Sequence, residues 1–208
     1  MNAELLFIYD THCPWSYAAT ALINEIHQHL PDIKIHYWHS AVFSAAEYDI
    51  GENITMDQLD SVEQASSIKF SAIYQQTLNT AKDSTLAANL LAWTNHKAAN
   101  KTLPLLNALQ QAHFQQGIEL TNIEQIQNII DELKLSPPTK ALKTDKLSKD
   151  AEFELHEIFA IQEIITTKAI PALLLVNGDN LTLLNHNLYL PTPKTIVEAI
   201  EFELRKTI

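Results

Sequence analysis

The feature that most constrains this chain is the junction between an apolar run and an amphipathic pattern near its start. Residues 5–9 are continuously apolar, which is typical of a strand buried on both faces. Beyond the junction, apolar residues recur at helical spacing as far as Leu30. Pro14 suits the first turn of that helix, because its missing N–H costs nothing there. The only cysteine of the chain, Cys13, therefore stands where a predicted strand leads into a predicted helix.

A second strand is predicted directly after this helix. Residues 33–38 alternate between the apolar Ile33, Ile35 and Tyr37 and a second set of side chains, as in a strand with two different faces. A strand, a helix and a strand joined by short connections form a parallel pair with a right-handed crossover. The start of the chain therefore predicts a β-α-β unit.

The middle of the chain predicts helices, and its end predicts a hairpin and one more helix. Residues 55–166 show helical patterns throughout, and capping boxes are expected at Thr55 with Gln58 and at Thr121 with Glu124. An apolar strand at 172–176 leads into a turn at 177–179 and a partner strand at 181–184. Residues 192–193, Thr-Pro, should cap the final helix. We therefore predict a first part at 1–54, a helical insertion at 55–166 and a second part at 167–208.

Composition limits the partners that the protein would bind. The net charge of −11 argues against nucleic acid and against an anionic membrane surface. The first residues include no basic segment and no long apolar stretch, so we expect no signal peptide, no membrane span and a cytoplasmic location. A single cysteine excludes an internal disulfide. The nine histidines lack zinc-site spacing, so we predict no metal and expect most of them at the surface.

Several motifs occur in an order that resembles the DsbA family of thioredoxin-fold proteins. Residues 10–17, Asp-Thr-His-Cys-Pro-Trp-Ser-Tyr, are similar to the Cys-Pro-x-Cys site that opens the first helix in that family. Residues 167–172, Thr-Lys-Ala-Ile-Pro-Ala, resemble its cis-proline loop. The helical segment and the closing hairpin and helix also match. The resemblance implies an α/β thioredoxin-like fold with a large all-helical insertion domain.

Two branches of this superfamily compete for the chain. Cys13 matches a branch of dithiol oxidoreductases, related to FrnE-type proteins, with cysteine at both active-site positions. Ser16, Asp10 and Tyr17 are more similar to kappa-class glutathione transferases and 2-hydroxychromene-2-carboxylate isomerases, in which serine replaces the first cysteine. The chain is therefore a hybrid of the two patterns, with Ser16 where a resolving cysteine would stand.

The predicted catalytic residues are Cys13, Ser16 and His12. The amides and positive end of the helix should lower the pKa of the Cys13 thiol, and a protonated His12 would act in the same direction. Asp10 would raise that pKa. Ser16 lies one helical turn from Cys13 and could donate a hydrogen bond to its sulfur. The alternative is that Cys13 is an inert core residue.

The predicted substrate-binding residues are Pro14, Trp15, Tyr17, Ile170 and Pro171. By resemblance, Pro171 would be cis and would face Cys13, and the backbone of Ile170 would pair with an extended substrate. Trp15 and Tyr17 would either wall an apolar pocket or pack the helix against the insertion.

Three hypotheses about function follow. The first is a thiol–disulfide oxidoreductase that works through Cys13 on a thiol or disulfide substrate, with an external thiol such as glutathione resolving the adduct. The second is a glutathione-dependent transferase or isomerase of the kappa type. The third is a non-catalytic protein that binds an extended peptide beside Pro171. Glutathione enters as a co-substrate and no bound cofactor is expected; whether the chain forms a homodimer is left open.

Overall fold

The computed structural model describes residues 3–43 and 54–206. Its first elements are strand β1 (Glu4–Tyr9), helix α1 (Pro14–His29) and strand β2 (Lys34–His39). β1 and β2 are parallel, with Glu4 opposite Lys34 and Tyr9 opposite His39. Pro14 occupies the first turn of α1. The predicted β-α-β unit is confirmed.

The described residues between β2 and the next strand form six α-helices and two short 3₁₀ helices. They are α2 (Met56–Ala65), α3 (Ala72–Gln76), α4 (Thr85–Lys97), η1 (Ala99–Lys101), α5 (Thr102–Gln116), α6 (Ile123–Glu132), η2 (Thr139–Leu142) and α7 (Lys149–Ile165). None of the described helices is long and apolar enough to cross a membrane.

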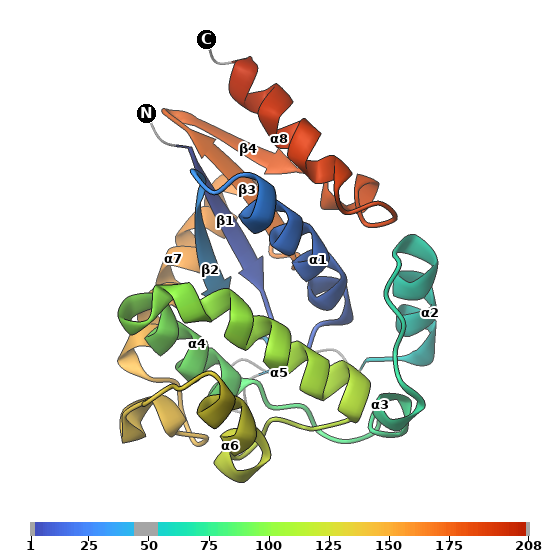
Figure 1. Ribbon diagram of the computed structural model, residues 1–208, viewed down its shortest axis with the longest axis vertical. Helices are drawn as coiled ribbons and strands as arrows, with labels where there is room; N and C mark the ends of the chain where they lie inside the picture. The colour runs from blue at the N-terminus through green and yellow to red at the C-terminus, as the bar shows by residue number, and fades with distance from the viewer. Residues whose placement is uncertain (1–2, 44–53, 207–208) are drawn as a thin grey trace.

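The chain then returns to the sheet with β3 (Ala172–Asn177), β4 (Asn180–Leu184), the 3₁₀ helix η3 (His186–Leu188) and α8 (Thr195–Arg205). The strand order is β2-β1-β3-β4. β3 runs antiparallel to both of its neighbours, β1 and β4, so the predicted hairpin is confirmed. Strands from the two ends of the chain therefore lie side by side at the centre of one sheet (Figure 1).

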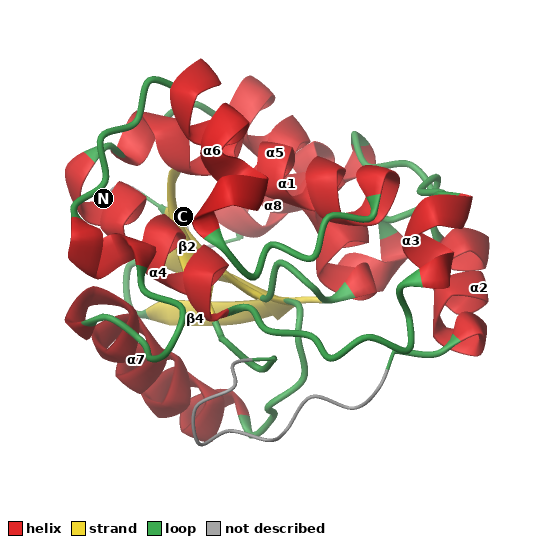
Figure 2. Ribbon diagram, turned by 90° about the horizontal axis from the view of Figure 1, so that it is seen from below, coloured by secondary structure: helices red, strands yellow, loops and turns green. Residues whose placement is uncertain are grey.

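The sheet is covered on both faces (Figure 2). α1 and α8 pack on one face, where the main apolar core continues into the helical region through residues such as Leu59, Leu106 and Ile126. α7 covers the other face, where Ile158 packs against Leu6 and Leu174. α7 was predicted within the insertion, yet it lies directly on the sheet. The predicted thioredoxin-like α/β class is confirmed.

Two helix starts differ from the predictions. The capping box at Thr55 and Gln58 is present, but the second box is formed by Asn122 and Gln125, one residue beyond the predicted pair. Asn122 is extended, and its Oδ1 accepts the Gln125 amide at 3.1 Å, since asparagine is among the best N-cap residues. At the end of the chain, α8 begins at Thr195; residues 192–194 form a turn before it.

Gly117 ends α5 in the left-handed conformation, with a φ of 71°. The amide of Gly117 donates to His113 O at 3.1 Å, which is the bond of the αL motif, and the amide of Ile118 donates to Ala112 O at 3.1 Å. An added Cβ at this glycine would lie 2.6 Å from Cγ2 of Ile73. Glycine is therefore required here by both its φ and the close approach of α3.

Candidate functional site

Cys13 is the N-cap residue of α1, in extended conformation. Its amide donates to the Asp10 carbonyl at 3.2 Å, and its own carbonyl accepts the amide of Tyr17 at 3.0 Å. The side chain is 8% exposed. The sulfur therefore lies at the positive end of α1, as predicted, but largely covered by protein.

Burial changes the expected ionisation of the thiol. Desolvation raises the pKa of Cys13 above its ordinary value, and the charge of Asp10 acts in the same direction. Hydrogen bonds from the Ser16 side chain and from the amides of Ser16 and Trp15 lower the pKa without outweighing burial. The prediction of a lowered thiol pKa is wrong for this state. The hydration free energy that a thiolate loses on burial exceeds the stabilisation that the helix amides provide.

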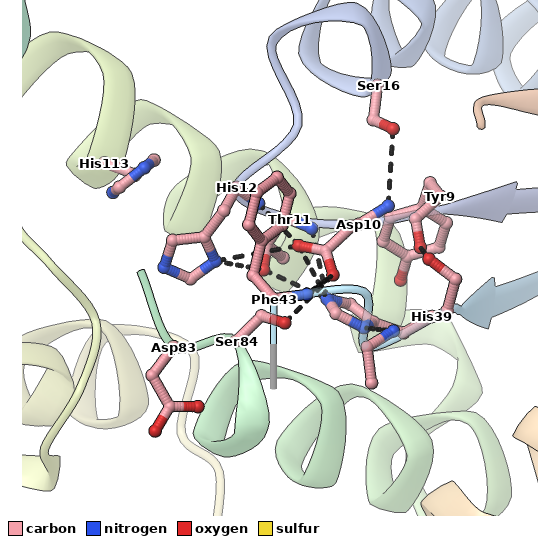
Figure 3. Close-up of polar contacts among 12 residues, drawn as sticks. Tyr9, Asp10, Thr11, His12, Ser16, His39, Phe43, Asp83, Ser84 and His113 are labelled. Atoms are coloured by element: carbon pink, nitrogen blue, oxygen red, sulfur yellow. Dashed lines mark hydrogen bonds and ion pairs between the residues drawn. The ribbon is translucent and has the colours of Figure 1, made fainter. Parts of the chain in front are cut away.

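The Ser16 hydroxyl is oriented by its own hydrogen bond. The amide of Asp10 donates to Ser16 Oγ at 3.3 Å (Figure 3), and the Ser16 side chain is fully buried. Because the serine oxygen accepts that amide, its proton is available for the sulfur of Cys13. This agrees with the side-chain hydrogen bond that lowers the pKa of Cys13.

Asp10 connects three segments around the Cys13 loop. Its Oδ1 accepts the His12 amide at 2.8 Å, and its Oδ2 accepts the Ser84 hydroxyl at 2.9 Å and the Phe43 amide at 3.5 Å (Figure 3). Burial raises the pKa of Asp10, but His39 and the hydrogen bonds from His12 outweigh it and hold the pKa well below its usual range. A buried carboxylate thus ties the start of α4 and the loop after β2 to the Cys13 loop. No sequence signal pointed to Ser84.

His39 is a second buried group in this network. Its Nε2 lies 3.0 Å from Thr11 Oγ1 and also faces the Thr11 amide at 3.1 Å, while its Nδ1 accepts the Ala41 amide at 3.0 Å. Both ring nitrogens thus face amide donors, which disfavours the doubly protonated ring. Burial lowers the pKa of His39 to about 4, despite the nearby charge of Asp10. The imidazole is therefore neutral at neutral pH.

His12 and His113 hold the loop after α5 over the start of α1. His12 Nε2 donates to the Glu119 carbonyl at 3.0 Å, and His113 Nδ1 donates to the Ile118 carbonyl at 2.7 Å. The two rings are 4.3 Å apart. His12 Nδ1 lies 3.1 Å from Thr11 Oγ1, so both of its nitrogens are engaged. The expectation that most histidines are surface residues misses the three that build this site, which are His12, His39 and His113.

The cis-proline loop meets the same end of the sheet. The Ile170–Pro171 peptide bond is cis. Ala172 pairs with Ile8 in the β1–β3 register, and continuing this antiparallel register by one step places Pro171 opposite Tyr9. The loop thus adjoins the segment that leads to Cys13, and the position of Pro171 facing Cys13 stays a prediction. Pro171 is buried, and Ile170 is half-buried against the α7 side of the sheet.

The aromatic residues beside Cys13 contribute to packing. Tyr17 stacks on Phe114 of α5 with ring centroids 4.7 Å apart, and its hydroxyl accepts Gln115 Nε2 at 3.4 Å. Trp15 is half-buried against the main core. Tyr17 also lines a surface pocket of about 450 Å³ with residues of α1 and α5. Packing against the insertion is therefore established for Tyr17, and the substrate-wall role of these two residues stays a prediction.

Among the described residues, no group of three or more His, Cys, Asp or Glu side chains is placed to hold a metal ion. In the buried cluster at Asp10, its Oδ1 lies 3.7 Å from His12 Nδ1 and 3.8 Å from His39 Nε2. These nitrogens bond to neighbouring protein groups instead.

Comparisons with solved structures support the same fold. The cytosolic disulfide reductase DsbM from Pseudomonas aeruginosa, in a structure with GSH, is 18% identical with a TM-score of 0.79; the match covers 97% of this chain and 99% of that one. A putative protein disulfide isomerase from Nitrosomonas europaea is 16% identical with a TM-score of 0.71, covering 100% and 97%. A 2-hydroxychromene-2-carboxylate isomerase is 16% identical with a TM-score of 0.61, covering 98% and 97%. At these identities the likeness shows the fold alone.

A comparison with curated proteins finds no match. The family comparison does find one, because residues 4–157 match the DSBA-like thioredoxin domain. This match spans well over half of the 208 residues and includes Cys13, Ser16 and Asp10. The chain therefore belongs to the family of DSBA-like thioredoxin domains.

Proposed function

We propose that this protein catalyses thiol–disulfide exchange through Cys13 alone, with an external thiol completing the cycle. The observation that carries the proposal is the Ser16 hydroxyl, which the Asp10 amide fixes at 3.3 Å so that its proton serves the Cys13 sulfur. A serine held in this way stabilises charge on the sulfur but cannot form a disulfide with it. The loop at Ile170 and Pro171, which the β1–β3 register places at the same end of the sheet, supports a substrate site beside Cys13.

The proposed cycle has two exchange steps. The Cys13 thiolate attacks one sulfur of a substrate disulfide, forming a mixed disulfide and releasing the other sulfur as a thiolate that takes up a proton. An external thiolate then attacks the substrate sulfur of the mixed disulfide and releases Cys13 as the thiolate. One disulfide is consumed and one is formed, so no other oxidant or reductant is required. Ser16 and the α1 amides stabilise the Cys13 thiolate in both steps.

The surroundings of Cys13 favour the reductive direction. A strong oxidant of this type needs a stabilised thiolate, because a thiol of low pKa leaves readily from a mixed disulfide. Here burial and Asp10 raise the pKa of Cys13, which makes its thiolate a poorer leaving group and the mixed disulfide more stable. We therefore propose that the protein reduces substrate disulfides, through a mixed disulfide with Cys13, rather than delivering disulfides to other proteins.

Glutathione is the external thiol that we propose. The DsbM structure, of similar fold, was determined with GSH, and the reaction needs a small thiol that reaches a nearly buried sulfur. A cytoplasmic location, which also remains a proposal for this chain, would supply reduced glutathione in a reducing environment.

Intact-mass spectrometry with oxidised glutathione tests the proposal. The unaltered protein should gain one glutathione on Cys13 and lose it when reduced glutathione is added. It should also accelerate reduction of a glutathionylated peptide, measured with glutathione reductase through NADPH consumption. Cys13→Ser should abolish both results, and Ser16→Ala should keep the adduct but slow turnover. Ser16→Cys should let Cys13 form an internal disulfide and release its adduct without added thiol.

The same measurements separate the alternatives. If no adduct forms on Cys13 and reduction is not accelerated, the proposal is wrong. Conjugation of glutathione to an electrophile by the unaltered protein that survives in Cys13→Ala would indicate the kappa-type transferase instead. Capture of an extended peptide by both the unaltered protein and Cys13→Ser, without turnover, would indicate the binding protein.

A further inference from the structure

Strand β4 forms an unprotected edge of the sheet. It pairs with β3 on one side, and no described strand lies on its other side (Figure 1). Its register with β3 runs through five consecutive pairs without a bulge. Residues 180–184, Asn-Leu-Thr-Leu-Leu, include no charged side chain and no proline. Bulges, charges and prolines are the usual protection of an edge strand, so β4 is left able to pair with another strand.

The opposite edge of the sheet, at β2, is protected. Asn95 of α4 donates from its Nδ2 to the carbonyl oxygen of Tyr37 at 2.6 Å, so a side chain of the helical region already occupies backbone of that strand. β2 also carries the charge of Lys34. The two edges therefore differ, and β4 is the one that offers its backbone to a partner.

The two-residue turn at 178–179 decides which backbone groups of β4 point outward. Such a turn makes its flanking residues a hydrogen-bonded pair, here Asn177 and Asn180. Bonding alternates along an antiparallel strand, so every second residue from Asn180 bonds to β3, and Leu181 and Leu183 direct their N–H and C=O groups to the open edge. Within the described chain, no backbone hydrogen bond from outside the sheet reaches either leucine.

The side chains of these two leucines lie together on one face. Leu181 pairs with Val176 and Leu183 pairs with Leu174, and both partners lie on the face that α7 covers. Residues opposite each other in a sheet share a face. Leu183 is 48% exposed and Leu181 is half-buried. The edge therefore combines unpaired backbone groups with incompletely buried apolar side chains.

We propose that β4 joins two copies of this chain into a homodimer with one continuous sheet. Leu181 and Leu183 lie on either side of Thr182. A two-fold axis beside Thr182 therefore places Leu181 of each copy opposite Leu183 of the other, and each such pair exchanges two backbone hydrogen bonds. A contact of this kind is self-complementary and closes at two copies. It uses no group of the thiol site, so it stands independently of the proposed function.

The charges near β4 fit a second copy in this register. Asp179 then lies opposite the uncharged Asn185, so no like charges meet across the axis although each chain carries a net charge of −11. Like charges directly opposite each other would destabilise the pair. A shift that sets Leu181 opposite Leu181 would instead bring Asp179 opposite the apolar Leu183. Charge and backbone bonding therefore select the same axis, beside Thr182.

Sedimentation velocity measures the mass in solution. The unaltered protein should have twice the mass of one chain. Leu183→Glu should halve that mass, because it places a carboxylate without a partner between the two strands. Ile73→Glu is the matched control, since Ile73 is 57% exposed on α3, well away from β4 (Figure 1). It adds the same charge and should leave the dimer intact.

A cross-link tests the register. The two Thr182 residues form a non-hydrogen-bonded pair on the axis, with Cα atoms about 4.5 Å apart, which suits a disulfide. Thr182→Cys, made together with Cys13→Ser so that no other thiol is present, should form a covalent dimer on oxidation. Asp179→Cys in the same background should not, because the two copies of position 179 lie six residues apart along the paired strands, roughly 20 Å.

Other results overturn the proposal. They are a mass of one chain for the unaltered protein, assembly beyond two copies, a dimer that persists in Leu183→Glu, or an equal loss of mass in Ile73→Glu. If circular dichroism shows that Leu183→Glu is unfolded, the cross-link decides: a covalent dimer at position 182 but not at 179 supports the proposal, and equal yields at the two positions refute it.

Discussion

Replacing Glu154 by glutamine should stabilise the protein at neutral and alkaline pH. Glu154 lies in α7 and is 3% exposed. Its Oε1 accepts Nδ2 of Asn95 at 2.7 Å, while its Oε2 is buried without a partner among the described residues. Burial raises its pKa to about 7, although hydrogen bonds from Asn95 and the His39 amide act against this. The folded protein therefore retains a proton here that the unfolded chain has already lost.

The magnitude follows from the two pKa values. A folded pKa of about 7 against an ordinary 4.5 corresponds to about 3 kcal/mol, at 1.36 kcal/mol for each pKa unit. Because the folded pKa is the higher one, this stability is fully present below pH 4.5 and is lost as the pH rises through about 7. Glutamine keeps the acceptor for Asn95 and never ionises. The advantage of Glu154→Gln should therefore grow with pH until it levels off above about 7.

Urea denaturation between pH 4.5 and 8.5 measures this effect. The quantity of interest is the difference in unfolding free energy between Glu154→Gln and the unaltered protein, because the titration of all other groups cancels in it. That difference should increase by about 3 kcal/mol over the range. Glu157→Gln, at an exposed position of the same helix, should show no such increase. Parallel curves for Glu154→Gln and the unaltered protein would refute the reasoning.

Three further substitutions, the first with Thr121→Ala for comparison, test the local structure by urea denaturation. Asn122→Ala removes the observed cap of α6 and should cost about 1 kcal/mol, whereas Thr121→Ala should cost less. Gly117→Ala forces a Cβ into left-handed backbone 2.6 Å from a neighbouring methyl group, so it should cost more than about 1 kcal/mol; a neutral result would contradict the close approach of α3. Ser84→Ala removes a donor to the buried Asp10 carboxylate and should cost about 1–3 kcal/mol. The charged Asp10 carboxylate stabilises the fold only at pH values above its lowered pKa. In strong acid, where Asp10 is protonated, Ser84→Ala should therefore reduce the unfolding free energy by less than it does at neutral pH.

The linear pattern was enough to predict the framework that carries the site. The apolar run before Cys13, the helical spacing after it and the turn at 177–179 are local signals, and each specifies an element from residues close in sequence. The cis-proline loop followed from resemblance of residues 167–172 to a known motif. The cap at Thr55 was predicted, but the α6 cap was placed one residue too early, because Thr121 and Asn122 both suit an N-cap and only the backbone selects between them.

Local patterns in the sequence predict the order of elements, the place of Cys13 at a helix start and the serine one turn beyond it. How that cysteine behaves depends on the packing of distant segments. The helix end that lowers a thiol pKa is a local effect, whereas the desolvation that raises it depends on what packs over the sulfur. Asp10 meets Ser84 across 74 positions, and His12 meets Glu119 across 107. No pattern near Cys13 specifies these partners, because they are brought together by burial of apolar surface elsewhere in the insertion.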